Sequence, residues 1–141
     1  SAAVHLRGPV TTSCLRSVIW PHRLKLLWFE DCSFNQPIAS FVWPASLQQL
    51  SFGACFNQPI TGVVWPASLQ HISFDDCDFN QPIAEVVWPA SLHQLSLGDV
   101  FNQPIAGVVW PASLHKLSFG ISFNRPIGAV VWPASLHKLS F

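Results

Sequence analysis

Residues 47–69 read LQQLSFGACFNQPITGVVWPASL, and most of the chain consists of approximate copies of this stretch. The string Phe-Asn-Gln-Pro-Ile starts at Phe34, Phe56, Phe79 and Phe101, and it recurs as Phe-Asn-Arg-Pro-Ile at Phe123. A second string, Trp-Pro-Ala-Ser-Leu, starts at positions 43, 65, 88, 110 and 132, with a degenerate form at position 20. Two motifs that share one period of 22 or 23 residues identify a repeat array.

Each repeat predicts one short β-strand. In the segment Leu-Gln-Gln-Leu-Ser-Phe at residues 47–52, the last two apolar residues flank a serine, which is the two-residue period of a strand. The repeat is too short for a helix pair of about 34 residues or a propeller blade of about 40. Val4 and Leu6 fall in the same register, so we expect a first strand at residues 3–6 and seven parallel strands in total.

The segment that returns from one strand to the next reads Pro-Ile-x-x-x-Val-Trp-Pro-Ala-Ser. Its two prolines exclude a regular α-helix, because proline lacks an amide donor and clashes with the preceding turn. We therefore expect extended, polyproline-like and single-turn 3₁₀ backbone. The inward apolar side chains of one repeat are expected to be Leu47, Leu50, Phe52, Phe56, Ile60 and Val64. Burying so few side chains does not offset the conformational entropy that 22 residues lose on folding. A single repeat is therefore unstable alone, and the repeats must stack.

These motifs resemble a known family. The Leu-x-x-Leu-x-Phe-x-x-Cys-x-Phe segments at 24–34 and 69–79 are similar to the strand segment of leucine-rich repeats. With Phe-Asn-x-Pro-Ile and the closing Pro-x-Ser-Leu, the unit resembles the FNIP repeat, a short variant of that family, over residues 20–141. The resemblance implies a mostly β solenoid: a right-handed coil with one short strand per repeat, a concave parallel sheet and a Pro-rich convex side that is non-helical or 3₁₀. It also implies a binding or scaffolding module.

The repeat boundaries predict one domain over residues 1–141. It divides into a degenerate unit at 1–23, repeats at 24–46, 47–68, 69–91, 92–113 and 114–135, and a truncated last strand at 136–141. The chain starts at Ser1 and contains no Met, so we expect it to be a piece of a longer protein. An uncovered end strand invites pairing with another chain, so we also expect end-to-end self-association.

Composition excludes several classes of protein. Seven Lys and Arg balance seven Asp and Glu, which argues against nucleic acid as a partner, since binding phosphates needs a basic surface. Half of the residues are apolar, which excludes a disordered chain. Proline interrupts every apolar run before the roughly 20 residues that cross a bilayer, so no membrane span is expected.

Stacked repeats turn each sequence position into a column of side chains. The Phe of the first motif is expected to form a buried aromatic spine, and the following Asn a structural ladder that satisfies backbone groups at the bend. The ladder residues are Asn35, Asn57, Asn80, Asn102 and Asn124. The Trp column is expected to pack against the core, with an exposed platform for carbohydrate or Pro-rich peptides as the alternative.

The positions that vary between repeats are mostly strand positions expected to face outward on the concave sheet. Two explanations of this variation remain open: a recognition surface on a fixed frame, or sequence drift at exposed sites that packing does not constrain. The candidate binding residues are Trp28, Gln49, Ser51, His71, Ser73, His93, Gln94, Ser96, His115, Lys116, His137 and Lys138. Neutral hydrogen-bonding groups favour a protein or peptide partner, whose identity the sequence does not give. The alternative function is a structural, self-assembling scaffold or spacer.

No enzyme, metal or cofactor site is predicted. Ser96, His93 and Asp99 are near one another in the sequence, but every repeat has a comparable serine and nothing builds an oxyanion hole. The chain has no phosphate-binding Gly-rich motif and no His-Glu-x-x-His. The histidines at 93, 115 and 137 would span about 10 Å, which is too far for one tetrahedral zinc site.

The cysteines are expected to be structural. Cys32, Cys55 and Cys77 each stand three residues after a strand phenylalanine, so we expect one column of free, buried thiols, with Cys14 apart in the first unit. Reduced thiols weakly favour an intracellular compartment, although the sequence does not fix a location.

Overall fold

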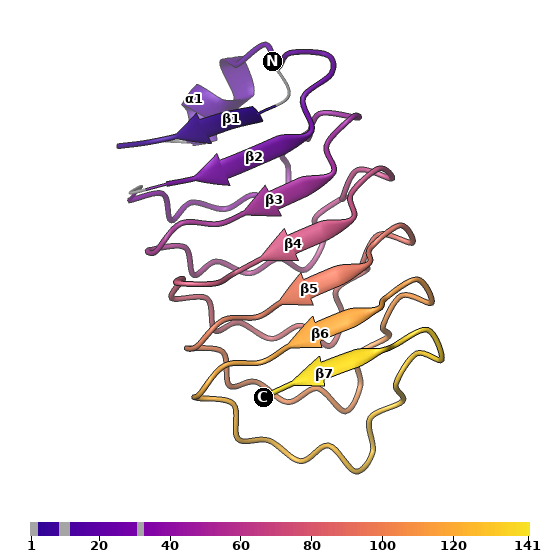
Figure 1. Ribbon diagram of the computed structural model, residues 1–141. Coiled ribbons are helices and arrows are strands. Elements are labelled where there is room, and N and C mark those ends of the chain that lie inside the picture. Colours follow the sequence, from indigo (N-terminus) through magenta and orange to yellow (C-terminus); the bar gives the residue numbers. More distant parts are fainter. Residues whose placement is uncertain (1–2, 9–11, 31–32) are drawn as a thin grey trace.

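The chain coils into a solenoid in which every repeat contributes one rung to a single sheet (Figure 1). This computed structural model describes residues 3–8, 12–30 and 33–141, without the side chains of 12–14. Among the described residues no helix is long and apolar enough to cross a membrane.

Seven parallel strands form the sheet in chain order, as the sequence predicts. Their bounds are β1 Ala3–Leu6, β2 Leu26–Phe29, β3 Gln49–Ser51, β4 His71–Ser73, β5 Gln94–Ser96, β6 Lys116–Ser118 and β7 Lys138–Ser140. The short helix α1 covers Thr12–Ser17.

The strands pair without any shift in register. His71 lies beside Gln94, Ile72 beside Leu95 and Ser73 beside Ser96. In β3, β4, β5 and β6 the middle residue is buried and its neighbours face the other way, which is the alternation that the Leu-x-x-Leu-x-Phe pattern predicts. Each repeat therefore makes one full turn of the coil.

Helix α1 was not predicted. It lies in the degenerate first unit, where residues 12–17 hold no proline, so the argument against a helix in the return segments does not apply there. Its Leu15 is only 2% exposed and belongs to the core. The helix therefore covers the first layer of the solenoid.

The other return segments consist of turns, which confirms a non-helical convex side. In the repeat that starts at residue 47, the amide of Val63 donates to the carbonyl of Ile60 at 3.2 Å, and that of Leu69 donates to Pro66 at 3.1 Å. The same two bonds recur in the following repeats. Gly62 has φ +83°, a left-handed conformation that glycine adopts without a side-chain clash.

Stacked aromatic rings run through the core. Phe34, Phe56, Phe79 and Phe101 are at most 1% exposed, with ring centroids 6.1–6.2 Å apart in successive layers. The Trp column packs in the same way: Trp43, Trp65, Trp88 and Trp110 are only 5–7% exposed. This burial rules out an exposed Trp platform at these four positions.

One inward position was predicted wrongly. Val64 is 78% exposed, whereas Val63 is 5% exposed and packs in the core. Val63 closes a turn, where the backbone is neither strand nor helix. No periodic pattern therefore shows which of the two valines faces inward. The next two repeats follow the same pattern, with Val86 and Val108 buried and Val87 and Val109 exposed.

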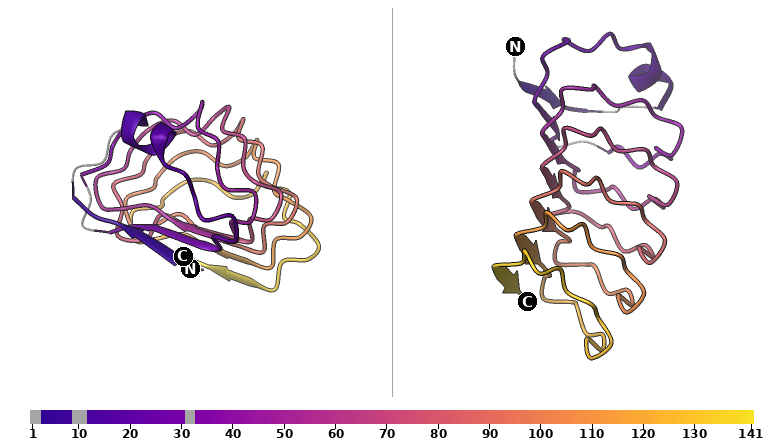
Figure 2. Two further views of the ribbon diagram at one scale, coloured as in Figure 1. Left: turned by 90° about the horizontal axis from the view of Figure 1, so that it is seen from above. Right: turned by 90° about the vertical axis from the view of Figure 1, so that its right-hand side faces the viewer.

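The solenoid curves gently (Figure 2). Stacked histidine rings on the strand side have centroids 5.0–5.1 Å apart, whereas stacked Trp rings on the return side have centroids 6.2–6.3 Å apart. The sheet is therefore the concave face and the return segments form the convex face.

Candidate functional site

The structure places the twelve predicted binding residues on or next to the strands, in three columns along the sheet. One column is the third residue of β2 and the last residue of β3 to β7: Trp28, Ser51, Ser73, Ser96, Ser118 and Ser140. Another is the first residue of each of these strands: Leu26, Gln49, His71, Gln94, Lys116 and Lys138. The residues before these strands form the third column: Lys25, Gln48, Gln70, His93, His115 and His137.

The histidines of the third column form a stack. His93 and His115 have ring centroids 5.0 Å apart and nearly parallel rings, and His115 and His137 are 5.1 Å apart with tilted rings. His93 and His137 are exposed. In the described part of the chain, no three or more His, Cys, Asp or Glu side chains gather in a way that would hold a metal ion.

The centre of the face is the least exposed part. Ser73 is only 8% exposed, and its hydroxyl oxygen accepts a hydrogen bond from the amide of Asp75 at 3.1 Å. The hydroxyl of Ser96 donates to the Asp75 carboxylate. Burial lowers the pKa of His71, and the nearby charge of Asp75 only partly opposes this shift. Since Ser96 donates to Asp75, its proton is directed at a carboxylate on the strand-end rim.

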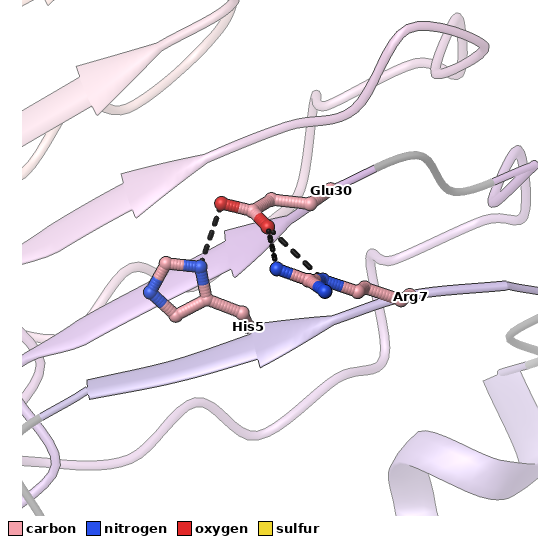
Figure 3. Close-up of polar contacts among 3 residues, drawn as sticks. All are labelled: His5, Arg7 and Glu30. Carbon is pink, nitrogen blue, oxygen red and sulfur yellow. Dashed lines mark hydrogen bonds and ion pairs between the residues drawn. The ribbon is translucent and has the colours of Figure 1, made fainter.

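A polar cluster lies at the N-terminal edge of the sheet (Figure 3). His5 Nδ1 is 2.6 Å from Glu30 Oε1, and the Arg7 guanidinium donates to Glu30 Oε2 at 3.0 Å and 3.2 Å. The hydrogen bond with His5, and then that with Arg7, hold the pKa of Glu30 below its usual range. The ring of His5 also meets the ring of Trp28 edge-on at 4.3 Å. Sequence reasoning missed this cluster, although aligning residues 3–6 with the next strand would have placed His5 beside Trp28.

The asparagines form a continuous hydrogen-bonded ladder at the bend after the strands. Each side-chain oxygen accepts from the backbone amide of the next Asn, as between Asn35 and Asn57 at 2.8 Å and between Asn57 and Asn80 at 2.9 Å. The pattern continues from Asn80 to Asn102 and from Asn102 to Asn124, each at 2.9 Å. The amides therefore stabilise the coil itself.

Two further ladders were missed. Gln58, Gln81 and Gln103 each donate a side-chain amide to the Asn of the previous repeat. Arg125 donates its Nε to Asn102 in the same way, which explains why Gln and Arg exchange there. The Ser of Trp-Pro-Ala-Ser-Leu donates to a leucine carbonyl of the previous repeat, as Ser91 does to Leu69 at 2.5 Å. The recurrence of these residues in successive repeats could have indicated both ladders. A polar residue that recurs in this way usually forms hydrogen bonds with buried backbone groups.

The prediction of free, buried thiols is right for Cys77, whereas Cys55 is free but was wrongly expected to be buried. Cys77 is buried and its thiol contacts the carbonyl of Phe56 at 3.1 Å, but Cys55 is exposed. The repeat of Cys55 is one residue shorter between strand and Phe56, so Cys55 directly precedes that phenylalanine and turns outward. Cys32 lies outside the described residues, as does the side chain of Cys14.

This difference predicts unequal thiol reactivity. Burial raises the pKa of Cys77 from 9.0 to about 11, and the thiolate is the reactive species. Iodoacetamide at pH 8 is therefore expected to modify Cys55 at least about tenfold faster than Cys77 in the folded protein. Peptide mass mapping over time measures both rates, with a urea-unfolded sample as the control in which the two converge. Equal rates in the folded protein would contradict the buried position of Cys77.

Comparison with known proteins agrees with this architecture. The FNIP repeat family model matches residues 56–100 and 101–141, which is more than half of the chain. The chain belongs to the FNIP repeat family. Among solved structures, the FNIP array is similar to CroV588, described as a novel circular LRR protein, with 46% identity and a TM-score of 0.73. The match covers 85% of this chain but only 17% of that one, and the search of curated proteins found no match. The leucine-rich-repeat-like solenoid predicted from the sequence is thus confirmed.

Proposed function

We propose that this FNIP array is a non-catalytic module that binds a protein or peptide through the concave strand face. The observation that carries the proposal is the alignment of varied, uncharged hydrogen-bonding side chains in unshifted columns above a fixed frame. Solenoids use such concave surfaces to hold extended partners. Gln49, Gln94 and the neighbouring serines offer both donors and acceptors to a polypeptide backbone.

The charges at the borders of the concave face indicate which charged groups a partner would carry at each end. Lys116 and Lys138 are exposed on β6 and β7, and they favour acidic groups at that end. At the strand-end rim, a hollow of about 280 Å³ is lined by Glu30, Asp75 and Asp76, and it favours a basic or amide group. We therefore expect a partner segment that is mainly neutral, with an acidic end over β6 and β7.

A library of random linear peptides displayed on phage tests this function. Selected peptides are expected to bind the wild-type array and to lose at least about tenfold in affinity when Gln49, His71, Gln94 and Lys116 are all replaced by alanine. These side chains are at least partly exposed, so the variant is expected to fold, which circular dichroism checks. Peptides that bind the variant as well as the wild type, or a library that yields no binder, would contradict the proposal.

The alternative function is a self-assembling scaffold, in which one array stacks on the last layer of another. There Phe141 is 61% exposed and Ile127 is 41% exposed, whereas the equivalent Phe119 and Ile105 are buried at 5% and 0%. A further repeat stacked on β7 would cover this surface, whichever chain supplies it, and CroV588, a solved structure with a similar fold, is described as circular. If end-to-end stacking is the function, light scattering is expected to show mass that rises continuously with concentration, and Phe141→Lys is expected to stop the rise. A lack of growth would contradict the scaffold, and it would leave the peptide experiment unaffected.

A further inference from the structure

A row of exposed aliphatic side chains runs along the convex face, on the opposite side of the coil from the proposed binding face. In each repeat it is the residue directly before the Trp, which is almost fully exposed although it is apolar. The row, called here the valine ridge, consists of Ile19, Val42, Val64, Val87, Val109 and Val131, which are 95%, 83%, 78%, 79%, 78% and 79% exposed.

The fold does not require these side chains. A valine that is 78% exposed contributes little to the core, and the exposed strand-face positions of the same repeats hold Gln, His and Lys instead. Glu85 is the only charged residue in the five return segments at 37–47, 59–69, 82–92, 104–114 and 126–136. Contiguous apolar surface without charge on a soluble domain marks an interaction site.

Grooves separate the side chains of the ridge. The groove between Val87 and Val109 has a volume of about 540 Å³ and is bordered by Trp88 and Pro111. The next groove, between Val109 and Val131, has a volume of about 450 Å³, and the one between Val64 and Val87 about 360 Å³. The convex face is thus corrugated with the period of the repeat.

We propose that the valine ridge is a docking surface for a second copy of this chain, packed back to back. Ridges and grooves that repeat at a fixed spacing fit along their length only against a partner with the same spacing. A second copy of this chain has the same spacing because it has the same repeats. With rings 6.2–6.3 Å apart on the convex side and 5.0–5.1 Å apart on the concave side, the curvature is small enough for several layers to meet. From Val42 to Val131, Glu85 is the only charged residue of the return segments, so electrostatic repulsion between the copies is small along this part of the ridge.

The available area matches a small dimer interface. Full burial of one valine-sized side chain removes roughly 60–120 Å² of apolar surface from water. Six such residues therefore offer about 400–700 Å² per copy, and the adjoining exposed alanines add to this. A specific interface needs about 600–1,000 Å² per partner. The ridge with its adjoining alanines thus reaches the lower end of this range, which suits a weak, reversible dimer that leaves the concave faces of both copies open.

Sedimentation equilibrium of the whole chain tests the proposal. The wild-type protein is expected to reach a mass of twice 15.6 kDa and to stop there, whereas end-to-end stacking would continue beyond two chains. Val87→Lys combined with Val109→Lys is expected to weaken dimerisation at least a hundredfold, because the lysines would be buried in the contact. Both positions are exposed in the single chain, so the variant is expected to keep the thermal midpoint of the wild type.

The matched control is Gln70→Lys combined with His93→Lys, which adds the same two side chains at exposed positions of the concave side. This control is expected to dimerise like the wild type, although it is free to affect peptide binding. A wild-type chain that stays monomeric at 0.5 mM, with or without binding to neutral lipid vesicles, would overturn the proposal. A dimer that survives in the valine variant, or that the concave control also abolishes, would overturn it too.

Discussion

Replacing Phe79 with alanine is expected to lower the free energy of unfolding by about 3–5 kcal/mol. Phe79 is 0% exposed, and its ring stacks on Phe56 at 6.2 Å, Phe101 at 6.1 Å and Phe74 at 4.2 Å. The substitution leaves a cavity between two layers of the coil, and the surrounding stacked rings prevent these layers from closing it. Because each layer is stabilised only by its neighbours, a loss in the middle of the array weakens both halves.

Urea denaturation followed by tryptophan fluorescence measures this effect. Phe141→Ala is the control, since Phe141 is 61% exposed and stacks on Phe119 and Phe123 in the last layer of the array. The control is expected to cost about 1 kcal/mol or less, because most of that ring is already in water. Similar losses in the two variants would contradict the buried spine.

Gly98→Ala is expected to cost at least about 3 kcal/mol, for two separable reasons. Gly98 has φ +81°, where any other residue is strained by about 1–2 kcal/mol. In addition, a Cβ atom at this position would stand only 2.2 Å from the carbonyl oxygen of Phe74 in the preceding repeat. Backbone cannot move away without separating two layers of the coil, so the steric cost adds to the conformational one.

Gly62→Ala separates the two costs. Gly62 has nearly the same φ, +83°, but a Cβ atom there would meet nothing within 4 Å. This control is therefore expected to lose only the conformational 1–2 kcal/mol, measured by the same urea titration. If Gly98→Ala were no more destabilising than Gly62→Ala, the close approach of adjacent repeats at Gly98 would be contradicted.

The elements governed by a strict period were predictable from the sequence. The alternation around Leu50 and Phe52 placed every strand, and a fixed repeat length placed the Phe and Asn columns, because stacking converts sequence spacing directly into spatial neighbours. The outward strand positions followed from the same alternation.

The features that depend on irregular backbone were not predictable from periodicity. In the segment Val63-Val64-Trp65 no periodic pattern distinguishes the two valines. The turn that ends at Val63 determines which of them faces inward. The aromatic Phe41 at the position of Val63 was the available clue, since a large apolar ring favours the core. Likewise, the shortened bend before Phe56 turned Cys55 outward, because one deleted residue changes the path of a turn although it leaves the strands in register.

Scalar couplings across hydrogen bonds, measured by NMR on the ¹⁵N,¹³C-labelled chain, test most directly whether each repeat is one rung of a shared sheet. The structure predicts couplings from the amide nitrogen of His71 to the carbonyl carbon of Gln48, from Gln94 to Gln70, and from Lys116 to His93. These partners are one repeat apart in the sequence, so no local structure produces such couplings. Couplings that instead join residues three or four apart within 69–74, or an absence of all three inter-repeat couplings, would contradict the solenoid.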